Sequence, residues 1–372
     1  MIEITSSGYQ QSLYWGAEST AGNKYGSSVT VDQSFGLVQS VNPTETNNLI
    51  KIRTMGGTRD YNNIVPGKFE VSGSFEYFLQ GGAFLRMAIG EDSGSTSTTD
   101  SGPRFHTGAA SYVHVLGSAA SPMADTFPSF TMEFTDEEDT GAVGTKNLKR
   151  TYNGCRINSL TISGTVDEPL SISGDWIAQG VTPSTAAATS VTDSTDDPFV
   201  FYQGAVYATS AVPAYDTAIT ATTHTQIAEV NTFDFTVSNN LEPIWYISGT
   251  TAPSQTLRGL KNLNVKGRDY EASLGLHFKN KDMFHRFLGS NTATSPATDL
   301  NKYQVVLDFV RSGSIGSDPK LATDDYMRLV LGSCAFNDMN MPGSPEDIVS
   351  ENIGVFVERA KLYVIDADAL FW

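Results

Sequence analysis

The side chains that most readily do chemistry in this sequence are carboxylates. Six of them stand in segments that alternate between apolar and polar residues, each on the side opposite the apolar set: Glu70, Glu76, Glu133, Asp269, Glu271 and Asp308. A period of two is typical of a strand with one buried face, so these carboxylates are expected on the wet face of a sheet. They form either an ordinary solvated surface or, where several copies curve around an axis, a negatively lined one that repels polyanions.

Other reactive residues do not form a recognisable site. Two acidic runs, 136–139 and 193–197, lack the alternating oxygen ligands and central Gly of a calcium loop, and we expect solvated loops there. His277 is expected on the polar face of a strand and His285 on a short helix, both in structural or solvent-facing roles. No nucleophile elbow, Walker loop, His-Glu-x-x-His or Cys-x-x-Cys occurs. The sequence therefore predicts no enzyme, no cofactor and no metal.

Composition excludes several classes of function. The chain has 372 residues and a net charge of −17, which argues against a protein that reads DNA sequence through Lys and Arg contacts to phosphate. It has no run of 18 apolar residues, and its first ten residues lack the basic and apolar regions of a signal peptide. We therefore expect no membrane role.

One unit of the sequence occurs twice. Residues 69–90 read FEVSGSFEYFLQGGAFLRMAIG, and residues 268–289 read RDYEASLGLHFKNKDMFHRFLG. In both, apolar residues first alternate and then recur at helical spacing, which predicts a strand followed by a short helix. One constant offset relates the two copies, and extending it upstream places Val38 on Val237. The match of residue class and the shared change of period favour a duplication.

A second, shorter offset covers the later part of each copy. It places Cys155 on Cys334 and Asn158 on Asn337. The two cysteines are therefore expected in separate domains, as buried thiols without a disulfide. Along the strands, Glu70 is aligned with Asp269 and Glu133 with Asp308.

The fold prediction is mainly β, with two tandem sandwich or barrel domains that each carry one short flanking helix. The predicted first domain spans 1–182, a Ser/Thr/Asp-rich linker spans 183–198, and the second domain spans 199–372. Two long Asn/Thr/Gly/Pro-rich segments, 42–66 and 241–265, are predicted to be loops in the same place of each copy. Loops of that length are usually functional or disordered, and their matching place in the two copies favours function.

With these units, the two long segments and the run from Gly154 to Gln179, the chain resembles the tail tube (major tail) proteins of long-tailed viruses of bacteria and archaea. The resemblance implies subunits that form rings, inner strands that line a channel, and long loops that reach the neighbouring ring. The candidate inter-ring residues are Asn42, Thr44, Arg59, Leu241 and Arg258. Family rings hold six units, so a chain with two units implies three chains per ring.

The resemblance also implies the partners. The chain would contact copies of itself, with tail terminator, baseplate or tape-measure proteins at the tube ends or in its channel, and DNA would pass through without specific binding. It would belong to the virion tail and assemble in the host cytoplasm. Two alternatives stay open at this point: the tube of a phage-like secretion or injection system, and a surface-displayed β-sandwich binding protein.

Overall fold

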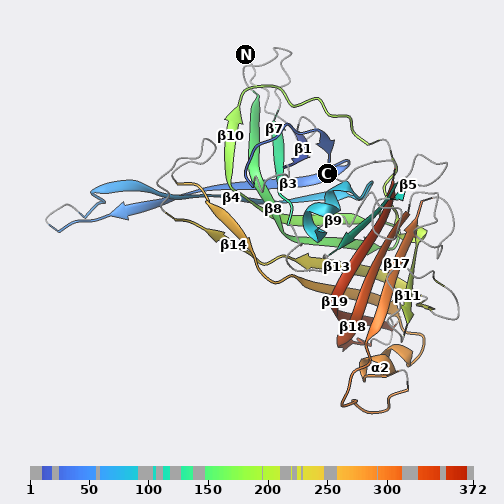
Figure 1. Ribbon diagram of the computed structural model, residues 1–372. Helices are drawn as coiled ribbons and strands as arrows, with labels where there is room; N and C mark the ends of the chain where they lie inside the picture. The colour runs from blue at the N-terminus through green and yellow to red at the C-terminus, as the bar shows by residue number, and fades with distance from the viewer. Residues whose placement is uncertain are drawn as a thin grey trace.

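The structure, a computed structural model, is built mainly of antiparallel strands (Figure 1). It describes residues 11–18, 25–55, 59–90, 104–105, 112–117, 127–136, 147–194, 196–209, 219, 224–227, 229–246, 258–290, 292–311, 326–343 and 349–366. The prediction of a mainly β fold is confirmed.

Within its described residues, the first half of the chain contributes ten strands and one short helical segment. The strands are β1 (Gln11–Ala17), β2 (Gln33–Ser34), β3 (Val38–Ile52), β4 (Asn63–Phe78), β5 (Arg104–Phe105), β6 (Tyr112–Gly117), β7 (Phe130–Asp136), β8 (Leu148–Thr165), β9 (Ser171–Ala178) and β10 (Gly180–Ser184). The helical segment consists of the 3-10 turn η2 (Ala83–Leu85) and α1 (Arg86–Ile89), at the position where the helical period was predicted.

The described residues of the second half form nine strands. They are β11 (Gly204–Thr209), β12 (Thr225–Ile227), β13 (Val230–Ser238), β14 (Leu241–Ile244), β15 (Asn262–Val265), β16 (Asp269–His277), β17 (Tyr303–Val310), β18 (Tyr326–Asn340) and β19 (Ser350–Asp366). The 3-10 turn η3 (Phe201–Gln203) precedes β11, and α2 (Asp282–Phe287) follows β16.

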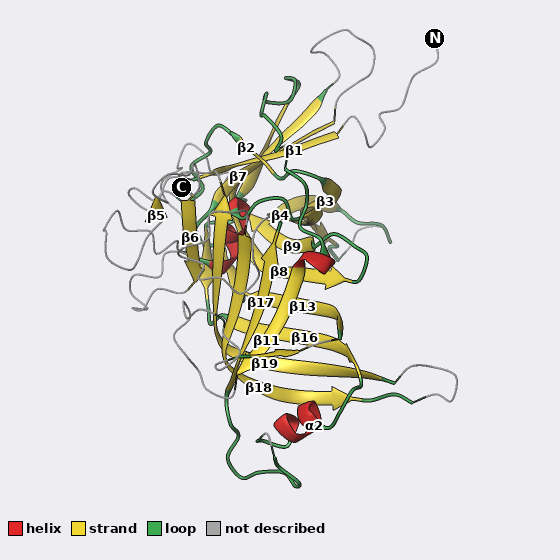
Figure 2. Cartoon of the chain, turned by 90° about the vertical axis from the view of Figure 1, so that its right-hand side faces the viewer, coloured by secondary structure: helices red, strands yellow, loops and turns green. Residues whose placement is uncertain are grey.

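Eight of these strands form what we call the long sheet, in the order β3-β4-β9-β8-β13-β16-β19-β18. The two halves meet in it along one ladder, in which β8 and β13 pair continuously from Ser159↔Ser238 to Thr165↔Thr232. The long sheet is therefore continuous from the first half into the second (Figure 2).

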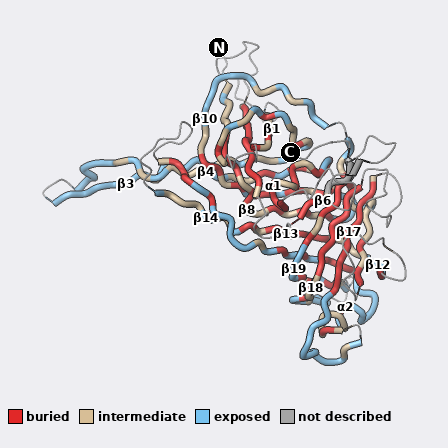
Figure 3. The backbone as a smooth tube through the Cα atoms, in the orientation of Figure 1, coloured by how far each residue is buried: buried red, intermediate tan, exposed pale blue. Residues whose placement is uncertain are grey.

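A second layer covers the apolar face of the long sheet. In the first half it contains β2, β1, β7, β10 and the beginning of β8. In the second half it contains β12, β11, β17 and parts of β18 and β19, and the first-half strand β6 joins it by pairing with β19. Phe84 of η2 lies between the layers, with its ring centroid 5.2 Å from Trp15, 5.3 Å from Phe75 and 5.2 Å from Phe130. The core follows this interlayer space (Figure 3).

The ladders of the two halves share the same registers. Val71 pairs with Ala178 in the first half. Their counterparts by the two sequence offsets, Tyr270 and Val357, pair with each other in the second half. Bulges recur at matching places, one beside Asn158 in β8 and one beside Asn337 in β18. A one-residue slip in register would exchange the two faces of a strand. The matching registers and bulges therefore mean that equivalent residues of the two halves lie on the same face of the sheet.

Backbone conformations repeat as well. Gly90 and Gly289 close the two helical segments with φ of 110° and 116°. Gly154 and Ser333, which directly precede the two cysteines, both have positive φ, 63° and 55°, next to corresponding bulges.

The two cysteines, Cys155 and Cys334, are both free and buried, so the prediction of unpaired buried thiols is confirmed. Each thiol donates to the carbonyl three residues before it, of Tyr152 and Leu331 respectively. Burial and a local hydrogen bond thus give both thiols the same surroundings.

The upstream alignment from the sequence was wrong by seven residues. Val38 pairs with Tyr77, and the residue that pairs with the corresponding Leu276 is Val230 rather than Val237. The reason is the hairpin connection, since the chain from Ile244 to Asn262 is seven residues longer than that from Ile52 to Asn63. Before each hairpin turn a smaller offset therefore applies, the one that relates Val38 to Val230.

The two segments predicted to be long loops are hairpin arms. Arm 1, residues 47–66, is the outer part of the β3–β4 hairpin, and arm 2, residues 239–265, contains β14 and β15. The four outermost pairs match between the arms, as in Ile52↔Asn63 and Ile244↔Asn262. Arm 1 is solvated on both faces along most of its length and has no apolar alternation, so its strands gave no periodic signal.

Candidate functional site: the polar face of the long sheet and the two arms

The outward face of the long sheet carries three rows of mostly polar residues that run across the strands. The first row is Ser40, Glu76, Ser173, Thr161, Thr236, Glu271 and Phe356. The second is Asn42, Ser74, Asp175, Ser159, Ser238 and Asp269. The third is Phe78, Ser171, Ser163, Asp234, Ser273, Gly354 and Asp338. Each row holds two carboxylates, and none holds a Lys or Arg.

Three of the predicted carboxylates belong to these rows. Glu76, Asp269 and Glu271 are exposed on the polar face, as alternation in β4 and β16 predicted. Because no row contains a Lys or Arg, these three have no partner of opposite charge within their rows.

Glu70 lies on the same face at the base of arm 1. There Lys68 Nζ donates to its Oε1 over 2.6 Å, and Asn48 donates to its Oε2 over 2.6 Å. The hydrogen bond from Lys68 lowers the pKa of Glu70. Glu70 is therefore a paired carboxylate, unlike those of the three rows.

Sequence reasoning missed three carboxylates of the polar face, namely Asp175, Asp234 and Asp338. All three are exposed. Ser159 donates to Asp175 over 2.9 Å and Ser273 donates to Asp234 over 3.1 Å. Hydrogen bonds from neighbouring strands thus fix the orientation of two of these carboxylates. Period-two alternation in β9 and β13 was the signal that could have found the first two.

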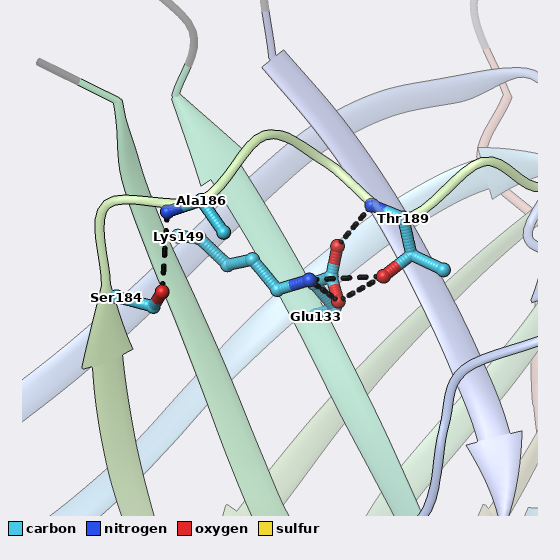
Figure 4. A network of polar contacts seen from close by, with 5 residues as sticks. All are labelled: Glu133, Lys149, Ser184, Ala186 and Thr189. Atoms are coloured by element: carbon cyan, nitrogen blue, oxygen red, sulfur yellow. Dashed lines mark hydrogen bonds and ion pairs between the residues drawn. The ribbon is translucent and has the colours of Figure 1, made fainter. Parts of the chain in front are cut away.

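Glu133 does not belong to the polar face. It lies in β7 with 3 % of its surface exposed, because every residue of that strand except the last is buried. Figure 4 shows its carboxylate enclosed by Lys149 and Thr189: Lys149 Nζ lies 2.6 Å away, and the Thr189 N–H and hydroxyl each donate over 2.7 Å. Its negative charge is thus neutralised inside the second layer.

Asp308 is buried in the same way. It has no exposed surface in β17, and Arg328 donates to its two oxygens from Nε and Nη2 over 2.9 and 3.0 Å. The expected placement of Glu133 and Asp308 on an open face was therefore wrong, because strands β7 and β17 are covered on both faces.

The alignment of these two carboxylates was also wrong. The ladder pairs Asp308 with Arg328 and Thr135 with Lys149, so Asp308 corresponds to Thr135. Glu133 corresponds instead to Val306, which pairs with Val330 as Glu133 pairs with Thr151. The two cations, Lys149 and Arg328, hold equivalent positions. The two carboxylates do not, because Glu133 lies two residues before Thr135, the counterpart of Asp308.

Arm 2 is folded against the first half. Asn239 is fully buried: its Nδ2 donates to the carbonyls of Ala88 and Ile157, each over 3.1 Å, and its Oδ1 accepts from Arg268 over 2.8 Å. The Leu241 N–H donates to Asn158 Oδ1 over 3.0 Å. Together, these contacts hold the beginning of arm 2 against α1 and the bulge of β8.

Several described residues of the returning half of arm 2 are buried too. Leu260 and Leu263 are each 1 % exposed, and the Leu263 carbonyl accepts a hydrogen bond of 2.7 Å from Arg156. Arg258 donates to the Gly67 carbonyl and to Asn47 Oδ1 at the base of arm 1. Two of the residues expected to contact another ring, Leu241 and Arg258, are thus occupied inside the chain.

Arm 1, by contrast, projects from the body and is exposed (Figures 1 and 3). Its apolar side chains lie in solvent; they include Leu49, Ile50, Met55, Tyr61 and Ile64. Of the remaining inter-ring candidates, Asn42 and Thr44 lie in the body of β3, and Arg59 lies in the exposed connection at the tip of arm 1.

The acidic runs hold no metal cluster in the described residues, where no group of three or more His, Cys, Asp or Glu converges. Asp136 instead pairs with Arg150 over 3.0 Å, residues 137–139 lie outside the described part, and Asp193 accepts a hydrogen bond from Ser34. Within the described part of the chain, every helix is too short to span a membrane.

Comparison with known proteins points to one family. No curated protein matches the sequence. A family model described as phage tail tube protein matches residues 8–355, which include both arms, the whole junction between β8 and β13 and most of each half. The chain therefore belongs to the phage tail tube protein family.

Proposed function

We propose that this protein is the building unit of a viral tail tube, in which three chains close into a ring, rings stack, and the polar face of the long sheet lines the channel for the genome. Membership of the tail tube family supports a structural role in the virion tail and self-assembly into a tube. The ring of three chains and the lined channel are our inference.

The observation that carries the proposal is the ladder between β8 and β13. It joins the fourth long-sheet strand of the first half to the first long-sheet strand of the second. The registers make β13 the counterpart of β3, and β8 the counterpart of β18. The two outer strands of the long sheet, β3 and β18, are therefore the counterparts of the two strands, β13 and β8, that pair with each other inside the chain.

Both outer edges are open in the described part of the chain. There, β3 pairs only with β4, and β18 beyond Cys334 pairs only with β19. An unpaired edge is a template for another strand, and a head-to-tail contact that repeats one rotation closes into a ring. Transferring the register of the β8–β13 ladder places Thr46 of one chain opposite Asp338 of the next, and Thr44 opposite Asn340.

Two prolines make the ladder between chains weaker than the one inside the chain. Pro43 and Pro342 lie within the segments that would pair, where the intrachain ladder has Phe235 and Ser163. A proline has no N–H to donate, and proline on an edge strand limits uncontrolled pairing. We infer that each chain first folds into a stable monomer and that the monomers then assemble into the ring.

The charge of the polar face fits a channel for DNA. Each of its three rows contributes two carboxylates per chain, hence six per ring, without a cation among them. A negative wall repels phosphate and has no Lys or Arg with which to release counterions, so DNA would pass without being held. Terminator, baseplate or tape-measure proteins would contact the tube ends or its lumen, and assembly would take place in the host cytoplasm.

Electron microscopy and mass measurement of the purified chain test the proposal. The expected result is hollow rings or tubes whose rings contain three chains and show six-fold projections; discrete monomers at all concentrations would contradict it.

A charge reversal tests the lining of the channel. In the assembled state, Glu76→Lys with Glu271→Lys should make the channel retain DNA at low salt and release it at high salt. A control with Glu168→Lys and Asp299→Lys, two exposed positions outside the three rows, makes the same change of charge and should retain none. Equal retention by both variants would remove the polar face from the channel.

A further inference from the structure

The two arms have the same construction and opposite environments. The tripeptide Asn-Asn-Leu occurs at 47–49 and at 239–241, and the ladders make these two tripeptides equivalent. Asn48 donates to Lys68 O and Glu70 Oε2, and Asn240 donates to the corresponding atoms of Gly267 and Asp269. The bases of the arms are thus built alike, down to individual hydrogen bonds.

The first asparagine of each tripeptide is also held in a similar way. Arg268 donates to Oδ1 of Asn239, and Arg258 donates to Oδ1 of Asn47. In Asn239 the amide nitrogen then donates to two carbonyls of the first half. In Asn47 the same oxygen accepts a hydrogen bond from an arginine, but the side chain is exposed.

Beyond this base, equivalent residues differ in burial. Leu263 is 1 % exposed in arm 2, while its counterpart Ile64 in arm 1 is 53 % exposed. Leu260 is 1 % exposed, while its counterpart Tyr61 is 46 % exposed. The difference arises because arm 2 packs against the first half, whereas the outer part of arm 1 projects away from the body of its own chain.

The surface that receives arm 2 has a counterpart in the second half. Arm 2 binds Ala88 of α1, Ile157 and the bulge residue Asn158. The equivalent positions, which we call the docking surface, are Phe287 of α2, Phe336 and the bulge residue Asn337. Asn337 is exposed, and α2 is more open than α1, since Phe284 is 42 % exposed where Leu85 is fully buried.

We propose that arm 1 of one chain docks on the docking surface of the next chain in the same ring, with Asn47 and Leu49 making to Phe287, Phe336 and Asn337 the contacts that Asn239 and Leu241 make inside the chain. The proposal rests on the proposed ring and names its interface. The occupant is a second copy of this chain, because arm 1 and arm 2 share their residues at the contact and the register that positions them.

The interface between chains is more apolar than its intrachain template. Arm 1 has Ile50 where arm 2 has Glu242, and the docking surface has Ala335 where the first half has Arg156, which donates to arm 2. The contact therefore relies more on burial of apolar side chains of arm 1 than on charged hydrogen bonds. Such side chains return to solvent whenever the ring opens, which explains why a monomer displays this patch.

Engineered disulfides test the contact with a control in the same molecule. Leu49→Cys with Asn337→Cys should link chains through oxidation and give a covalent closed trimer in non-reducing electrophoresis. Leu241→Cys with Asn158→Cys is the intrachain counterpart and should form a disulfide without raising the molecular mass. Leu49→Cys with Asn158→Cys should form neither an interchain nor an intrachain disulfide. The native thiols of Cys155 and Cys334 do not interfere, because both are buried.

The outcomes separate the interface from the function. The docking of arm 1 would be overturned if the wild-type chain forms hollow tubes and the intrachain control oxidises, but the cysteine pair at positions 49 and 337 does not. That result would leave the proposed tube function standing. A covalent trimer that never forms a hollow tube would support the docking and contradict the proposed function.

A second readout keeps the proposal testable where cysteines disturb folding. Ile64→Asp should leave the monomer folded and abolish assembly, because Ile64 is exposed in the monomer. Leu263→Asp, the matched change in arm 2, should unfold the monomer, because Leu263 is buried. Normal assembly of the Ile64→Asp chain would overturn the docking.

Discussion

Asn47 and Asn239 hold the same position in the two halves, yet their side chains differ: among the described residues, that of Asn239 is fully buried with three hydrogen bonds, and that of Asn47 is exposed with one, from Arg258. Replacing either by Ala removes the same side chain from the same local backbone pattern. The two substitutions therefore report on two different contacts: a buried one inside the chain and, by our proposal, one between chains.

We expect Asn239→Ala to destabilise the monomer by about 3 kcal/mol, because the carbonyls of Ala88 and Ile157 lose their partner in a buried site. Asn47→Ala should change monomer stability by less than about 1 kcal/mol, as exposed substitutions usually do. Urea unfolding at concentrations that keep the chain monomeric measures both. Equal losses of stability would show that Asn47 is already fully engaged within the monomer.

Shortening arm 1 should separate folding from assembly. Residues 51–64 can be replaced by Asn-Gly, which forms the two-residue turn that a hairpin ending at Ile50 and Val65 requires. Because residues 51–55 and 59–64 are exposed, the free energy of unfolding should stay within about 1 kcal/mol of wild type, while ring formation in electron micrographs is lost.

The matched change in arm 2 replaces residues 243–263 by Asn-Gly. It removes the buried Leu260 and Leu263, and we expect a clear loss of monomer stability. Normal rings from the shortened arm 1 would exclude that arm from the contact between chains.

The buried pair of Asp308 and Arg328 should behave as a unit. Asp308→Leu leaves the guanidinium buried without its partner and should destabilise the chain by about 3–5 kcal/mol. Adding Arg328→Leu should restore much of that loss, since an apolar pair of similar volume is often tolerated. The exposed pair of Lys302 and Glu358 is the control, for which Glu358→Leu should have an effect below about 1 kcal/mol in chemical unfolding.

Burial raises the pKa of the Cys334 thiol to about 12. The folded state therefore favours the neutral thiol, and its contribution to stability is complete below pH 9 and is lost as the pH rises towards 12. Within that window Cys334 should lower the free energy of unfolding by about 1.4 kcal/mol per pH unit. The difference between wild type and Cys334→Ala isolates this slope from that of the buried tyrosines, whose ionisation on unfolding is the same in both proteins; parallel pH profiles would contradict it.

Local patterns determined much of the fold from sequence alone. Alternation from Phe69 to Leu79 and from Tyr270 to Leu276 established the strands, their buried faces and the helical segments that follow, whereas Phe278, expected on the buried face, lies beyond the end of β16 and is exposed. These patterns were readable because each strand has one face in the core and one in water, so that every second residue reports its environment. The same logic correctly placed Glu76 and Glu271 on the polar face.

What only the tertiary structure decided are the relations between distant segments. Strands β7 and β17 are buried on both faces, so alternation there did not reveal that Glu133 and Asp308 are enclosed by Lys149 and Arg328 across the ladder. The arms are solvated in one copy and packed in the other, because burial depends on which surface the rest of the chain brings to them. Pairing of β8 with β13 likewise depends on hydrogen bonds between backbones far apart in the sequence, and backbone groups are nearly the same in every residue.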